Sequence, residues 1–78
     1  MSELRFHADG SVPGCVHFAA KAADMDAYKE VLYWCTDRYG EPDKIEAITE
    51  VPERWAYYPY VIVLVRPDDI LDFKLRWI

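Results

Sequence analysis

Hydrophobic and polar positions in the last third of the chain follow two different patterns. Residues 60–65 (Tyr-Val-Ile-Val-Leu-Val) are apolar at every position, which predicts a strand covered on both faces in the middle of a sheet. Residues 73–78 (Phe-Lys-Leu-Arg-Trp-Ile) instead alternate between large apolar and basic side chains. This alternation predicts a closing strand with one buried face.

Two shorter alternating runs lie near the N-terminus, at Leu4–Ala8 and Cys15–Ala20. The residues between them are rich in Gly, Pro and Asp, which favour turns, so we expect a β-hairpin with a long loop. A loop centred near Val12 gathers the apolar side chains on one face. The same register makes His7 and His17 cross-strand neighbours on the other face.

The segment from Asp24 to Tyr39 has the periodicity of an amphipathic helix, since apolar residues recur at steps of three and four. Asp24 is a suitable N-cap, Gly40 suits the position after the last turn, and Pro42 prevents continuation. The apolar stripe consists of Met25, Tyr28, Val31, Leu32, Cys35 and Tyr39. We therefore predict one long helix packed on the sheet.

Two further segments complete the expected order of elements. Residues 44–51 alternate except at Ile48, and Ile45 with Ile48 would also fit one helical turn; we predict a strand, because Thr49 is a good strand residue. Residues 67–71 predict a short helical turn, with Pro at its first position and two acids near its start.

These elements predict an α+β, two-layer domain covering residues 1–78. Its mainly antiparallel sheet has about five strands in the order β-β-α-β-β-short helix-β, with one main helix on one face. The apolar strand at 60–65 needs cover on its second face as well. The aromatic segment before it, the short helix or a second copy of the chain would supply that cover, so a homodimer is one expectation.

Composition narrows the class of protein. The formal net charge of −5 disfavours nucleic acid as a partner, because an acidic surface repels phosphates. The two cysteines indicate free thiols in a reducing compartment, and the longest apolar run is too short to cross a membrane. We expect a cytoplasmic protein. No phosphate-binding or dinucleotide-binding motif is present, so no cofactor is predicted.

The polar face of the hairpin offers the first candidate site. His7, Asp9, Cys15 and His17 would lie together there and could ligate a zinc ion, although their spacing matches no known zinc signature. Cys15 with either histidine is also a possible nucleophile and base. The alternative is a polar outer face that happens to contain two histidines.

The second candidate site is an aromatic cluster with neighbouring charges. Tyr, Trp and Arg dominate binding hot spots in protein interfaces, and all three residue types occur in residues 54–60. The candidate protein-binding residues are Glu50, Glu53, Arg54, Trp55, Tyr57, Tyr58 and Tyr60. The alternative is that these rings complete the small core, because each ring has much apolar area to bury.

The C-terminal half contains a series of motifs that end in an apolar and basic run. Trp34 in a helix that ends Arg38-Tyr-Gly40, an aromatic segment from Trp55 and an acidic turn at residues 68–69 precede the terminal 73–77 motif, Phe-Lys-Leu-Arg-Trp. In these motifs the chain resembles small uncharacterised proteins encoded by tailed bacteriophages. The chain departs from the usual pattern at two positions, where it has Leu71 and Ile78. The resemblance implies an accessory or host-interaction protein acting in the host cytoplasm, and it carries no assigned chemistry.

We therefore expect a small, non-enzymatic interaction module, such as a phage-encoded accessory or inhibitor-like protein that binds a host or phage protein. A small metal-binding or catalytic domain that uses the hairpin face is the first alternative. A self-assembling structural subunit is the second.

Overall fold

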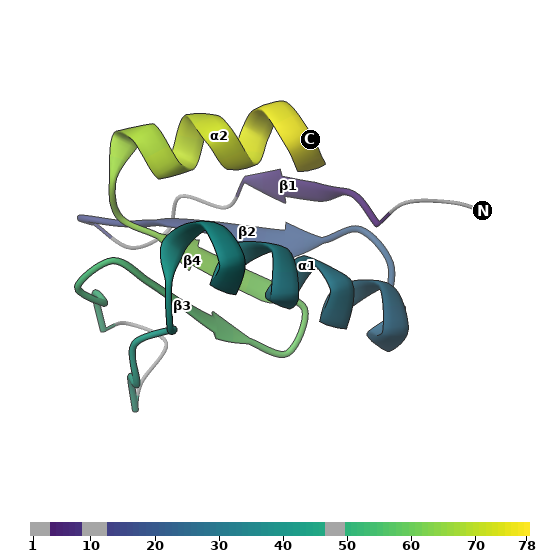
Figure 1. Cartoon of the computed structure of the whole chain (residues 1–78), viewed down its shortest axis with the longest axis horizontal. Helices are drawn as coiled ribbons and strands as arrows, with labels where there is room; N and C mark the ends of the chain where they lie inside the picture. Colours follow the sequence, from purple (N-terminus) through teal and green to yellow (C-terminus); the bar gives the residue numbers. More distant parts are fainter. Residues whose placement is uncertain (1–3, 9–12, 47–49) are drawn as a thin grey trace.

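The computed structural model describes residues 4–8, 13–46 and 50–78 of the chain, and these residues form a four-stranded antiparallel sheet and two helices (Figure 1). In chain order the elements are β1 (Phe6–Ala8), β2 (Val16–Ala20), α1 (Met25–Tyr39), β3 (Trp55–Tyr58), β4 (Val61–Leu64) and α2 (Pro67–Trp77). The α+β class is confirmed. The predicted number of five strands is wrong for the part of the chain that the structure describes.

The sheet has the strand order β1-β2-β4-β3, so the apolar strand β4 lies between two others, as its sequence predicts. Its residues alternate between the two faces of the sheet. Ile62 and Leu64 belong to the hydrophobic core beneath the helices. Val63 points to the opposite face and is also fully buried, which explains the continuous apolar run.

The N-terminal hairpin forms, but its register differs from the predicted one by two residues. Phe6 pairs with Ala20 and Ala8 pairs with Phe18, whereas a loop centred near Val12 would have placed Phe6 opposite Phe18. A shift of two residues leaves every side chain on its predicted face, so the hydrophobic pattern does not distinguish the two registers. His7 consequently pairs with Ala19 and is not opposite His17.

Helix α1 begins and ends where the sequence predicts. Asp24 is the N-cap, and its carboxylate accepts a hydrogen bond of 3.1 Å from the Ala27 N–H. Gly40 closes the helix with φ 88° and ψ −168°, a conformation that is essentially restricted to glycine. The Gly40 N–H donates to the Thr36 carbonyl oxygen at 3.0 Å.

The predicted closing strand at 73–78 is wrong, because residues 67–77 form helix α2 (Figure 1). Pro67 and the two acids of the first turn start a helix that does not stop after one turn. Phe73 and Trp77 are buried, but Leu75 between them is 79% exposed. The alternating apolar residues thus occupy two opposite sides of a helix, since a spacing of four residues also returns to the same helical face.

The predicted strand at residues 44–51 is also absent from its described part: residues 44–46 and 50–51 are in no strand, and 47–49 lie outside the described residues. Asp43 lies beside the start of β3, where its N–H donates to the Trp55 carbonyl oxygen at 2.8 Å. Pro52, just after these residues, is buried, so the chain packs onto the domain at that point.

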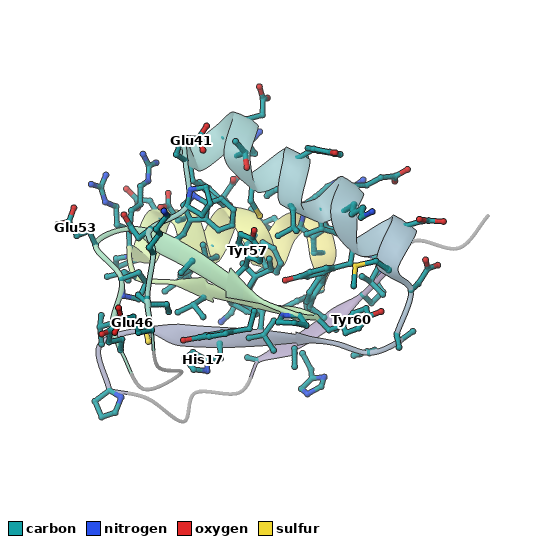
Figure 2. The ribbon with its side chains drawn as sticks, turned by 90° about the horizontal axis from the view of Figure 1, so that it is seen from below. His17, Glu41, Glu46, Glu53, Tyr57 and Tyr60 are labelled. Atoms are coloured by element: carbon teal, nitrogen blue, oxygen red, sulfur yellow. The ribbon has the colours of Figure 1, made fainter. Side chains whose placement is uncertain are left out.

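Helices α1 and α2 lie on the same side of the sheet (Figures 1 and 2). Phe73 of α2 packs against α1 and the first two strands. Its ring centroid is 5.2 Å from that of Phe6, 4.8 Å from Phe18 and 6.2 Å from Trp34 of α1. Trp34 also meets Trp77 edge to face at 5.6 Å. Aromatic packing therefore joins both helices to the first two strands.

Candidate functional site

The position of β3 at one edge of the sheet creates the best candidate surface. Tyr57, in the middle of β3, is 45% exposed. Figure 2 looks onto this edge and shows Tyr57 with Glu41, Glu46 and Glu53 to one side. All three glutamates are exposed. We call these four residues the β3-edge surface.

Charge is concentrated in the segment beside β3. Residues 41–53 contain five carboxylates (Glu41, Asp43, Glu46, Glu50 and Glu53) and one base, Lys44, which makes the segment −4 in a chain whose total is −5. Two of the five carboxylates are engaged locally. Asp43 accepts hydrogen bonds from the N–H groups of Arg54 and Trp55, and Glu50 accepts one from the Glu46 N–H at 3.1 Å.

Asp43 also limits how β3 can be extended by another strand. Its carboxylate binds the Arg54 N–H at 2.8 Å and the Trp55 N–H at 3.3 Å, while its own N–H occupies the Trp55 carbonyl oxygen. Covering part of an edge in this way prevents uncontrolled pairing with other chains. A partner at this edge would therefore use the side chains of the β3-edge surface more than a new run of strand hydrogen bonds.

Trp55, one of the predicted binding residues, belongs to the core. Its side chain is fully buried, and its Nε1–H donates to the Gly40 carbonyl oxygen at 2.9 Å. Its ring packs edge to face on Tyr39 of α1, at 6.4 Å between centroids. This ring joins the end of α1 to β3 and offers no surface to a partner.

Arg54 is held by an ion pair within the domain. Its Nε lies 3.0 Å from a carboxylate oxygen of Asp69, at the start of α2, and its guanidinium lies 5.7 Å from the ring centroid of Tyr39. The hydrogen bond to Asp69 raises the pKa of Arg54. Asp69 itself is buried, so Arg54 supplies the charge that this carboxylate needs.

The last two predicted aromatic residues lie around the β3–β4 turn. Tyr60 has a positive φ of 64°, which is uncommon for a residue other than glycine. The Tyr28 hydroxyl on α1 donates toward two carbonyl oxygens on either side of the turn, those of Tyr58 and Val61. The carbonyl oxygen of Tyr60 accepts a hydrogen bond of 2.8 Å from the Ala20 N–H. These contacts hold the turn in place, and Tyr57 remains the most exposed ring of the predicted set.

The opposite face of the sheet carries His17, one of the predicted metal or catalytic residues. His17 points to this face, away from the helices (Figure 2), and is 3% exposed. His7 is exposed and two residues out of register with it, while Asp9 lies outside the described residues. Within the described ranges, no group of three or more His, Cys, Asp or Glu side chains is placed to hold a metal ion.

The thiols show no sign of activation. Burial raises the pKa of Cys15, and it raises the pKa of Cys35, under α1, to about 12. A thiol with a raised pKa supplies less thiolate at neutral pH, and thiolate is the reactive form. The burial of both thiols therefore does not favour thiolate formation at either cysteine.

Tyr58 and His17 each bury a polar atom on this face. The Tyr58 hydroxyl and the His17 Nε2 are both buried without a hydrogen-bond partner among the described residues. Burial, followed by the nearby Glu50 and Cys15, raises the pKa of Tyr58. Gly14 lies close to Val51: a Cβ atom placed on Gly14 would be 3.6 Å from a methyl carbon of the Val51 side chain.

Sequence reasoning missed a shallow cleft between the helices, lined by Asp37, Arg38, Tyr39, Asp68, Asp69 and Asp72. Its charges are largely paired: Arg38 makes two hydrogen bonds to Asp72, at 2.6 and 2.7 Å, and the Tyr39 hydroxyl donates to Asp72 at 3.1 Å. Spacing along the chain gives no signal for these contacts, because they join α1 to residues about 30 positions away.

Comparisons with protein-family models, with curated proteins and with solved structures find no match to this chain. Among the described residues, no helix has both the length and the apolar composition that crossing a bilayer would require.

Proposed function

We propose that this chain is a small, non-enzymatic interaction module that binds a basic surface of a protein partner through its β3-edge surface. The observation that carries this proposal is the concentration of charge. A sequence segment with five carboxylates and one lysine precedes β3 and is hydrogen-bonded to its start through Asp43, and β3 carries a half-exposed tyrosine at the edge of the sheet. Tyrosine is enriched in binding hot spots, and a surrounding charged rim selects a partner of opposite sign.

The resemblance to small phage proteins suggests the biological setting. We propose a phage-encoded accessory or inhibitor-like protein that acts on a host or phage protein in the host cytoplasm. The terminal Phe-Lys-Leu-Arg-Trp motif supports this only through its residues, because in this chain it is helical and Phe73 and Trp77 are core residues.

Electrostatic binding of this kind has a predictable dependence on salt. Exposed charges attract over a Debye length of about 8 Å at physiological ionic strength, and salt screens them. Complementary charge speeds association more than it slows dissociation. A partner held by the β3-edge surface should therefore associate more slowly as salt is raised.

The test is affinity capture from bacterial lysate with matched charge variants. One variant replaces Glu41, Glu46 and Glu53 by Gln; the control replaces Asp26 by Asn, Glu30 by Gln and Asp37 by Asn, three exposed acids of α1. Both variants change the net charge by the same amount. We expect a partner that is captured by the parent and the control but lost with the β3-edge variant.

A second pair of variants separates binding from folding. Tyr57→Ala should reduce capture of the same partner while leaving the melting temperature nearly unchanged, whereas Trp55→Ala should unfold the domain because Trp55 is core. Equal capture by the parent and the β3-edge variant contradicts the proposal. If the α1 control variant loses the partner to the same extent, the binding depends on net charge and not on the β3-edge surface.

A further inference from the structure

The edge strand β3 leaves one pair of backbone groups open to a partner. The Val65 N–H, just after β4, donates to the Arg54 carbonyl oxygen, just before β3, at 3.2 Å. Backbone groups alternate in direction along a strand, so those of Trp55 and Tyr57 point away from β4. Asp43 occupies the outward groups of Trp55. No described residue is hydrogen-bonded to the outward N–H and carbonyl oxygen of Tyr57.

The Tyr57 ring lies beside these open backbone groups. Tyr57 is 45% exposed, and its ring packs on the buried Trp55 with 6.1 Å between centroids and an angle of 32° between the ring planes. A residue paired directly opposite Tyr57 in an antiparallel partner would have its Cα atom about 5.5 Å away and its side chain on the same face. That side chain would therefore contact the exposed part of the ring.

The two ends of β3 differ in charge. Figure 2 shows the three glutamates of the β3-edge surface on the side of Tyr57 where β3 begins, and Tyr60 of the β3–β4 turn on the other side. The C-terminal end of α1 is also close to the start of β3, because the Gly40 carbonyl oxygen accepts from the Trp55 Nε1–H. This end of a helix carries the negative end of the helix dipole. A cation beside Tyr57 is therefore attracted toward the start of β3.

We propose that the β3-edge surface binds an extended segment of its partner in which an arginine pairs with Tyr57 in antiparallel orientation. The arginine N–H donates to the Tyr57 carbonyl oxygen, and the arginine carbonyl oxygen accepts from the Tyr57 N–H. Its guanidinium lies against the Tyr57 ring in a cation–π contact. Because the same surface is used, this recognition rests on the proposed function and names the kind of segment that is bound.

Charge and geometry together select this occupant. A guanidinium is planar, stacks on aromatic rings and can donate two hydrogen bonds to one carboxylate, which suits a tyrosine with glutamates beside it. In antiparallel orientation, the residues that follow the arginine run toward the start of β3. Asp43 blocks further backbone pairing there, so the segment leaves the edge after one pair. Basic side chains that follow the arginine then reach the glutamates, whereas those that precede it lie toward the β3–β4 turn.

Titration of the isotope-labelled full chain with short blocked peptides, followed by amide NMR spectra, tests this proposal. The first peptide consists of threonines around one central arginine, with two lysines after the arginine. The Tyr57 amide signal should shift and saturate at millimolar peptide. Citrulline in place of the arginine has nearly the same shape without the charge, and it should raise the dissociation constant by about threefold or more. Two lysines placed before the arginine should bind more weakly than two placed after it.

Further variants separate the contribution of the backbone from that of the ring. A methyl group on the backbone nitrogen of the arginine removes the donor to Tyr57 and should abolish the shift of its amide signal. Tyr57→Phe keeps the ring and should bind like the parent, whereas Tyr57→Leu should lose the preference for arginine over citrulline. Tyr33→Leu is the matched control, because Tyr33 is a 73% exposed ring on α1. A circular-dichroism melt of each variant verifies that it folds.

An unshifted Tyr57 amide overturns the proposed recognition, and so do equal dissociation constants for the arginine and citrulline peptides. Equal binding with the lysines before and after the arginine overturns the antiparallel orientation. Affinity capture with the glutamate variant tests the proposed function separately. If capture depends on the glutamates while the peptides show no preference for arginine, the proposed function stands and only the arginine recognition is wrong.

Discussion

The two helices differ in how they are specified and in what they expose. Helix α1 has a side-chain cap at its start, a glycine that closes its end and one apolar stripe that faces the core. Helix α2 begins at Arg66, where no cap hydrogen bond from the side chain forms, and carries apolar residues on two opposite sides. Local signals were sufficient to define α1, whereas α2 depends on what its inner side contacts.

The difference teaches that an apolar pattern identifies buried positions only when one face of an element is polar. Along α1 the exposed positions are mostly polar, so the pattern has one interpretation. Along α2 the sequence Phe-Lys-Leu-Arg-Trp fits a strand with one apolar face or a helix with two. The packing of Phe73 against Phe6 and Phe18 favours the helix.

Phe73→Ala, in α2, should cause the largest loss of stability among the variants that compare the two helices. The ring packs on both N-terminal strands and on α1, so its removal should lower the free energy of unfolding by about 3–5 kcal/mol. Urea denaturation measures the change. The free energy of unfolding of a native domain is about 5–15 kcal/mol in total, so this variant should be close to unfolding.

Leu75→Ala is the matched control for Phe73→Ala. In a strand the two side chains would share the buried face, and both replacements would destabilise the fold. In α2 Leu75 is exposed, so its replacement should change the free energy of unfolding by less than about 0.5 kcal/mol. A large loss at both positions would contradict the helical structure of this segment.

An intermediate effect is expected at the helix starts. Asp24→Ala removes the carboxylate that accepts the Ala27 N–H and should cost about 1 kcal/mol of stability. Arg66→Ala, at the corresponding position of α2, removes no cap hydrogen bond and should cost clearly less. Thermal unfolding of both variants measures the difference, and equal losses would show that the capping bond does not distinguish the two helices.

The smallest effect concerns the ion pair that joins the helices. Arg38 holds the pKa of Asp72 below its usual value, so the pair stabilises the fold above the unfolded-state pKa of about 3.9. This contribution should be lost as the pH falls through the lowered folded-state pKa. Because both side chains are partly exposed, solvent screens the pair and its contribution to stability should be small.

The variant Asp72→Asn reports this contribution directly. Its free energy of unfolding should fall below that of the parent near neutral pH and should approach the parent value in strong acid. Urea denaturation at a series of pH values measures both curves. A difference that stays constant as the pH falls would show that the carboxylate charge is not responsible.

Of the β3-edge surface, the sequence predicts Glu53 and Tyr57 as binding residues. Glu41 and Glu46 are assigned to it only by the structure. Trp55 and Arg54 were also predicted as binding residues, because residue type alone does not separate a hot spot from a core ring or an internal ion pair. Their partners, Gly40 and Asp69, are about 15 residues away in the chain.

By itself, the sequence determined the α+β class, the extent of α1, the hairpin and the central place of β4, because local periodicity, caps and turn residues act over a few positions. Only the tertiary structure decided the hairpin register, the helical state of residues 67–77 and the burial of Trp55. Each of these depends on contacts between distant segments. A two-residue slip or a change from strand to helix leaves the local pattern satisfied, and the free energy of burying Phe73 and Trp55 selects one of the alternatives.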